Sequence, residues 1–151
     1  MPPQMTIYDP PDPCTLIDPG NVSRLRQLAS VKPKKETQPY LQQCTWLSHA
    51  GSEGTVSVQV HISDLRPRDA EATFPSLSNA GNCSEKVTTT FGSFCQDRDR
   101  QNVDIMRGNL HVLIYWVTTK LSRTTSDANR ISQAGPVTRQ LAEQALKNLP
   151  G

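Results

Sequence analysis

The clearest pattern in the chain is an alternation of apolar and polar residues over positions 55–62. Valine or isoleucine occupies positions 56, 58, 60 and 62, and polar residues occupy the positions between them. A period of two is typical of a half-buried antiparallel strand, because successive side chains point to opposite faces of a sheet. Shorter segments of similar character predict further strands at 40–47, 86–91, 103–106 and 110–118.

Turn signals connect these strands. The segment 110–118 is apolar at almost every position, which predicts a central strand covered on both faces. Arg107-Gly108-Asn109 before it favours a tight turn and therefore a hairpin with the strand at 103–106. Residues 49–54 predict a second hairpin loop, between the strands at 40–47 and 55–62. Residues 64–80 mix helix formers with two prolines, which predicts a short or broken helix and then an irregular loop.

Helical spacing appears near both ends of the chain. Asp18-Pro19 supplies a capping residue and a proline for a first turn, and apolar residues at 22, 25 and 28 or 29 then predict a helix over about 19–29. Residues 32–36 after it read as a polar, basic loop. Gly135-Pro136 and an apolar stripe predict a C-terminal helix over 136–149. The order of elements predicts an α+β two-layer sandwich, with a mainly antiparallel sheet of about five strands packed by N- and C-terminal helices.

The length of 151 residues suits one domain. The proline-dense residues 1–12 predict an extended linker or tether, with an ordered arm lying on the domain as the alternative, and residues 13–151 form the domain. Hydrophobic residues make up 35% of the chain and aromatic residues 5%, so we expect a modest core that benefits from covalent cross-links.

Four cysteines, Cys14, Cys44, Cys83 and Cys95, form no CxxC pair. An even number at these spacings predicts two structural disulfides, which persist in oxidising compartments outside the cytosol. Three pairings are possible; we favour Cys14 with Cys44 and Cys83 with Cys95, because each pair then brackets one compact segment. Inert buried thiols are the alternative, while the spacing does not suit a zinc site.

Charge and hydropathy exclude several classes of protein. The formal net charge is +2 and the basic residues form no dense cluster, which argues against a nucleic-acid partner. The longest apolar run is of strand length and is too short to span a bilayer. No signal peptide is visible, so the disulfide interpretation implies that an export segment precedes this sequence in the full protein.

Motifs for catalysis are sparse. The histidines, His49, His61 and His111, form no HExxH or paired i, i+4 motif, and the chain has no nucleophile elbow or glycine-rich phosphate loop. We therefore expect no catalytic residue, no metal and no cofactor. If their strands are neighbours, His61, His111 and Tyr115 would line one possible binding patch; the alternative is that these histidines only complete hydrogen bonds on a partly covered face. The mixed-charge residues 96–101 predict a solvated turn or a partner-docking loop.

Two cysteine motifs carry a resemblance to a known family. Asp12-Pro13-Cys14 and, thirty residues after the cysteine, Cys44-Thr45-Trp46 resemble the DPC and CxW segments of the DUF3558 family, and Phe91-Gly92-Ser93-Phe94 is similar to a later segment of that family. The resemblance implies an exported actinobacterial protein, typically a lipoprotein, with no assigned activity and with its first two cysteines paired. A looser similarity is to PknH-type extracellular sensor domains, which are disulfide-stapled sandwiches with a cleft.

Three function classes follow. The first is a non-catalytic exported cell-envelope protein, a lipoprotein ectodomain, that binds an envelope ligand or protein through its sheet face or a cleft beside the terminal helix. The second is an accessory or inhibitory subunit that modulates a surface enzyme, receptor or self-resistance system. The third is a hydrolase with a nonstandard site at His61, His111 and Tyr115. The expected location is extracellular, and membrane contact would come only through an N-terminal lipid anchor outside this chain.

Overall fold

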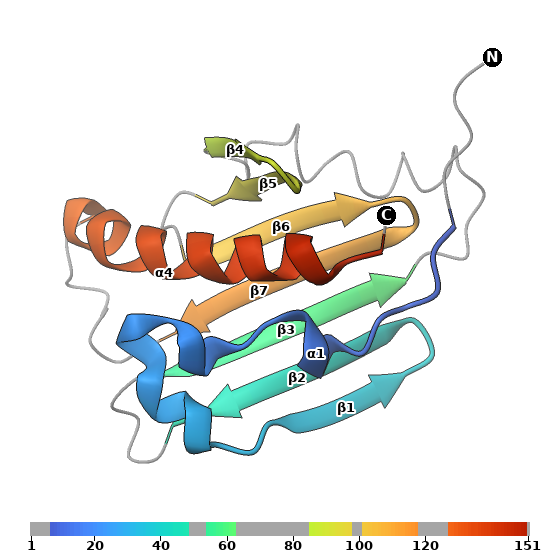
Figure 1. The fold of residues 1–151 in the computed structure, drawn as a ribbon, viewed down its shortest axis with the longest axis horizontal. Helices are drawn as coiled ribbons and strands as arrows, with labels where there is room; N and C mark the ends of the chain where they lie inside the picture. Colours follow the sequence, from blue (N-terminus) through green and yellow to red (C-terminus); the bar gives the residue numbers. More distant parts are fainter. Residues whose placement is uncertain (1–6, 49–53, 63–84, 98–100, 118–126, 151) are drawn as a thin grey trace.

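In the described part of the chain, a seven-stranded antiparallel sheet carries the helices α1 and α4 and the 3-10 segments between them on one face (Figure 1). The computed structural model describes residues 7–48, 54–62, 85–97, 101–117 and 127–150. The predicted α+β two-layer sandwich is confirmed, although the sheet has seven strands in place of about five. The predicted segment 64–80, and the loop 49–54 except for Gly54, lie outside the described residues.

The strands follow the order β1-β2-β3-β7-β6-β5-β4 across the sheet. Their bounds are β1 (Lys34–Gln38), β2 (Leu41–Leu47), β3 (Thr55–Ile62), β4 (Glu85–Thr89), β5 (Gly92–Gln96), β6 (Asn102–Arg107) and β7 (Leu110–Val117). The helical elements are α1 (Pro13–Leu16), the 3-10 segments η1 (Pro19–Asn21) and η2 (Ser23–Ser30), and α4 (Asp127–Asn148).

The central position predicted for β7 is confirmed, with β3 on one side and β6 on the other. The two-residue turn between β6 and β7 is also as predicted, and Gly108 there has a φ of 56°, a value that favours glycine. The prediction that β7 is covered on both faces was wrong. Its helix-facing residues are buried, but on the other face Tyr115 is only half-buried and Val117 is 52% exposed.

Two strands, β1 and β5, were missed for different reasons. All five residues of β1 are exposed, so the solvated edge strand reads in sequence as a polar loop. The predicted strand at 86–91 is in fact β4 followed by a two-residue turn, Thr90 and Phe91, and β5 begins at Gly92. Gly92 has a φ of 134° and closes this hairpin, which is why the chain reverses where one continuous strand was expected.

The predicted helix at 19–29 is replaced by η1 and η2, which are separated by Val22 in an extended conformation. Val22, Leu25 and Leu28 are all buried as expected. Their spacing of three residues matches the 3-10 period better than the α-helical period of 3.6. A Cβ on Gly20 would lie 2.5 Å from Ala29, so glycine permits the chain to fold back on itself here.

The C-terminal helix α4 begins at Asp127, nine residues before the predicted start, and Pro136 lies inside it. Proline removes one backbone hydrogen bond from a helix, and it is accepted here where α4 packs on the sheet. Ala134 and Val137 on either side of Pro136 are buried in the core, together with Leu141 and Ala145. Burial on both sides of the proline therefore outweighs its cost.

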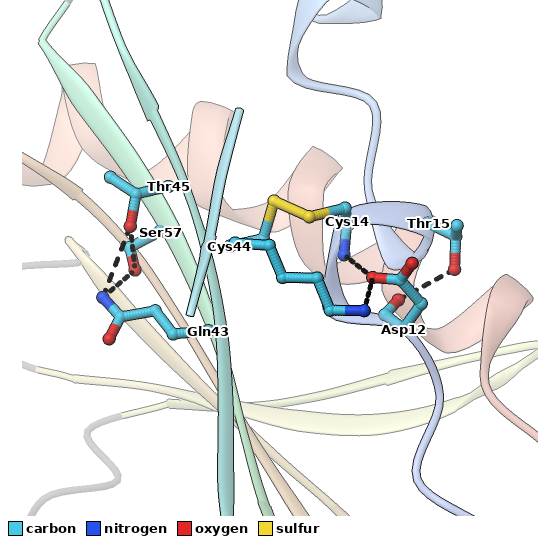
Figure 2. The surroundings of a disulfide bond; sticks show 8 residues. Asp12, Cys14, Thr15, Gln43, Cys44, Thr45 and Ser57 are labelled. Atoms are coloured by element: carbon cyan, nitrogen blue, oxygen red, sulfur yellow. Dashed lines mark hydrogen bonds and ion pairs between the residues drawn. A yellow bond between two sulfur atoms is a disulfide. The ribbon is translucent and has the colours of Figure 1, made fainter. Parts of the chain in front are cut away.

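A disulfide joins Cys14 at the start of α1 to Cys44 in β2 (Figure 2), so this predicted pairing is confirmed. Asp12 caps α1 by accepting a hydrogen bond from the backbone N–H of Cys14 at 2.9 Å, and it also pairs with Lys35 Nζ at 3.3 Å. Cys95 is disulfide-bonded as well, but its expected partner Cys83 lies outside the described residues, so that pairing stays a prediction.

The described part of the segment 1–12 lies on the domain. The backbone N–H of Tyr8 donates to Asn109 Oδ1 at 2.7 Å, and Asn109 Nδ2 donates back to the carbonyl of Tyr8 at 3.3 Å. This reciprocal pair fastens the arm to the β6–β7 turn, so residues 7–12 form an ordered arm. The boundary between tether and domain at residue 12 stays a prediction.

Loss of the Cys14–Cys44 bond should lower stability strongly, because the bond closes a loop of 30 residues in the unfolded chain. We expect the double substitution Cys14→Ser and Cys44→Ser to cost about 3 to 4 kcal/mol and about 10 °C in Tm. Differential scanning calorimetry under non-reducing conditions measures the change. A Tm within about 2 °C of the parent would show that the bond contributes little.

Candidate functional site

The structure brings together two of the three histidine and tyrosine residues in the predicted patch. His61 on β3 and His111 on β7 are direct cross-strand partners on the face opposite the described helices. Their rings stack with centroids 5.5 Å apart at an interplanar angle of 29°. Tyr115 shares this face but lies four residues along β7 from His111, roughly 13 Å away at the usual rise of a strand. Tyr115 is therefore not part of the histidine pair.

Asp104 on β6 completes this cluster and was not predicted. His111 Nε2 lies 2.8 Å from Asp104 Oδ1, and the two side chains are 10% and 12% exposed. On the other side of the pair, His61 Nε2 hydrogen-bonds Gln59 Oε1 at 3.0 Å. The sequence did contain a signal for this contact. The turn at 107–109 sets the register of the β6–β7 hairpin, and that register places Asp104 diagonally opposite His111.

The electrostatics of the cluster favour the neutral form of His61. Burial lowers the pKa of His61 below its ordinary value, the charge of His111 lowers it further, and Asp104 opposes both. Within the described part of the chain, no group of three or more His, Cys, Asp and Glu side chains is placed to hold a metal ion. The cluster thus matches the alternative of histidines that complete hydrogen bonds on a partly covered face.

A second candidate site lies on the opposite, helix-bearing face, in a hollow of about 310 Å³ between α4 and the β4–β5 hairpin. Its floor is Gln96, which is fully buried. Gln96 Nε2 donates to the carbonyl of Gly135 at 3.2 Å and to Thr138 Oγ1 at 3.0 Å. These two bonds to α4 fix the amide, so that its oxygen is directed at Arg139.

Arg139 forms the wall of this cleft and is incompletely paired. Its Nη2 lies 3.4 Å from Glu85 Oε1 and 3.5 Å from Gln96 Oε1, both at the long limit for a hydrogen bond. Its Nε is buried and has no hydrogen-bond partner among the described residues. A buried N–H without an acceptor costs free energy. The Arg139 side chain as a whole is 44% exposed, so a turn of this side chain that brings Nε to an acceptor on a ligand would gain a strong hydrogen bond.

The cleft continues along β4. A second hollow, of about 490 Å³, shares Arg139 and Glu143 with the first and is lined on its other side by residues 87–91. Phe91 at the turn is 52% exposed. Together the two hollows form one groove, which we call the α4–β4 groove, with charged groups at one end and an exposed aromatic ring at the other.

Comparisons with known proteins add no relative: no family model, no curated protein and no solved structure matches the chain. The similarity to the DUF3558 family and to PknH-type sensor domains therefore stays a prediction. In the described part of the chain, no helix is both long enough and apolar enough to cross a membrane.

The residues of the groove were only partly accessible to sequence reasoning. A cleft beside the terminal helix was considered, but Gln96 was assigned to a solvated mixed-charge turn and is instead fully buried. Arg139 and Glu143 lie four residues apart on α4, which places them on one helix face. That spacing was the one available signal, and it does not reveal which strand the face meets.

The histidine pair should make stability depend on pH. Because the folded-state pKa of His61 is lowered, the unfolded chain binds a proton that the folded chain does not, and stability falls as the pH drops below about 6.5. We expect His61→Gln to lose less stability than the parent between about pH 7.5 and about pH 5 in urea denaturation.

Thr55→Gln, on the same strand and face, is the matched control and should keep the parental pH dependence. Identical pH profiles for His61→Gln and the parent would show that this ring does not titrate differently in the folded and unfolded states.

Proposed function

We propose that the chain is a non-catalytic binding protein of the extracellular or cell-envelope compartment, and that its ligand occupies the α4–β4 groove. The observation that carries the proposal is the buried, unpartnered Nε of Arg139 beside an amide that is fixed in place by α4. Ligand sites are concave and present a few convergent polar groups, and the groove has this character.

The compartment is supported by the cysteine chemistry. The Cys14–Cys44 bond is present and Cys95 is also oxidised. Structural disulfides persist outside the cytosol, where glutathione and thioredoxin do not reduce them. The resemblance to exported DUF3558 proteins points to the same compartment.

The other two function classes have weaker support. An accessory or inhibitory subunit would present a flat or protruding contact surface, whereas the groove is concave. A hydrolase was expected to use His61, His111 and Tyr115 together, and Tyr115 lies too far along β7 to act with the pair. The binding protein therefore remains the best-supported class.

The test is a ligand screen with a variant that removes the guanidinium. The probes are free amino acids, short peptides, peptidoglycan fragments, oligosaccharides and dicarboxylic acids, added to ¹⁵N-labelled protein. A true ligand should shift amide resonances of α4, β4 and β5. Arg139→Met should weaken its binding by at least about tenfold, the equivalent of one charge-assisted hydrogen bond.

Lys147→Met is the matched control, because it removes one positive charge from an exposed position on the same helix. It should leave the affinity unchanged. The proposal fails if no probe class shifts the groove resonances, or if the two variants weaken binding equally.

A further inference from the structure

The last strand of the described sheet has an open edge. β4 pairs with β5 on one side, and no described strand pairs with its other side. Glu85, Lys86 and Thr88 are exposed, while Val87 and Thr89 are half-buried. An unpaired, exposed strand is a template for a further strand, because its outward backbone groups are directed at solvent.

The register identifies which backbone groups face outward. Thr89 and Gly92 flank a two-residue turn, and such a flanking pair exchanges its own backbone hydrogen bonds. Hydrogen-bonded pairs alternate with non-bonded pairs along an antiparallel ladder, so the backbones of Val87 and Glu85 also bond to β5. The N–H and C=O groups of Lys86 and Thr88 therefore point to the open edge, ready to pair with an incoming chain.

The side chains of β4 that face α4 line the groove. Glu85, Val87 and Thr89 share the sheet face on which α4 lies, and across from them α4 presents Arg139 and Glu143. A chain added at the open edge would direct every second side chain towards this groove. A segment of about five residues matches the length of β4.

We propose that the ligand of the α4–β4 groove is an extended peptide segment of a partner protein, which adds as an eighth strand along β4. This inference rests on the proposed function and names its ligand class. Peptides that add to a sheet edge gain affinity from main-chain hydrogen bonds and specificity from alternate side chains.

Charge and polarity define the side chains of this peptide. At one end of the groove Arg139 forms an ion pair with Glu85, and the exposed carboxylate of Glu143 adds a negative charge. A basic side chain is complementary to it, and a peptide carbonyl can accept the hydrogen bond from Arg139 Nε. At the other end, Val87 and exposed Phe91 suit an apolar side chain. The peptide is therefore expected to alternate, with basic and apolar residues directed at α4.

The experiment selects heptapeptides from a phage-displayed random library on the folded, disulfide-bonded protein. Selected sequences are resynthesised with blocked ends, and their affinities are measured by fluorescence anisotropy. We expect enrichment of basic and apolar residues at alternate positions, and micromolar binding that shifts the amide resonances of Lys86 and Thr88.

Two variants test the geometry. Thr88→Pro removes an N–H directed at the open edge and leaves the backbone bonds to β5 in place; of the contacts with β5 it removes the exposed bond between Thr88 Oγ1 and Ser93 Oγ. It should weaken peptide binding about tenfold. Thr37→Pro makes the same change at the outward position of β1 and should change the affinity less than about twofold. Circular dichroism checks that both variants fold.

Peptides methylated at alternate backbone nitrogens test the same point on the parent protein, so the result does not depend on the folding of a proline variant. Methylation in one phase should abolish binding, and methylation in the other phase should be tolerated. Binding that is insensitive to both Thr88→Pro and methylation would overturn the peptide proposal, as would a library without enrichment.

Further outcomes separate this inference from the proposed function. A small ligand that depends on Arg139 but not on Thr88 would support a binding protein and overturn the peptide class. A dimer in light scattering that Thr88→Pro dissociates would assign the edge to a second copy of the chain and also overturn it. Absence of any ligand that depends on Arg139 would overturn both proposals.

Discussion

The covalent bond between Cys14 and Cys44 is the constraint on which the helical layer depends. α1 is four residues long and cannot hold its place through its own hydrogen bonds, so the bond to β2 fixes it against the sheet. From there the constraint extends to α4, because Asn148 Nδ2 donates to the carbonyl of Leu16 at 3.0 Å. The Gln144 side chain also makes a reciprocal pair with the backbone of Asp18, at 2.7 and 3.1 Å. The position of α4 over the sheet is thus linked to a cross-link made near the other end of the chain.

The placement of α4 explains why a groove exists at all. The helix packs on β5, β6 and β7 and stops short of β4, so the last strand extends beyond the helical layer (Figure 1). Gln96 of β5 lies at the edge of the helical layer: it is fully buried and bonds both Gly135 and Thr138 beside the internal proline. One polar side chain therefore joins the sheet to the helix and also forms the floor of the groove.

The sequence predicted the elements whose burial is periodic. β3, β7 and the apolar stripe of α4 were found, because each presents one face to the core and repeats with the period of its element. The polar edge strand β1 was missed because exposure on both faces leaves no period. The early α4 start was missed because Pro136 is a common first residue of a helix, and only its tertiary contacts place it inside one. The site was less predictable still: the pairing of His111 with Asp104 needs the hairpin register, and that of Arg139 with Gln96 needs the contact between two elements far apart in sequence.

The histidine cluster and the groove lie on opposite faces of the sheet. An effect of pH on stability can therefore be distinguished from an effect of pH on ligand binding. His61 and His111 alternate along their strands with buried valines that face the helical layer, whereas Gln96 pairs with Val103 on the helix-bearing face. Protonation of His61 places a charge beside the β3–β7 ladder, at the centre of the sheet and several strands away from β4. Protonation therefore acts directly on the free energy of unfolding. The charged side chains that line the groove are Glu85, Arg139 and Glu143, so protonation of His61 acts on the sheet and reaches a ligand in the groove only through the fold.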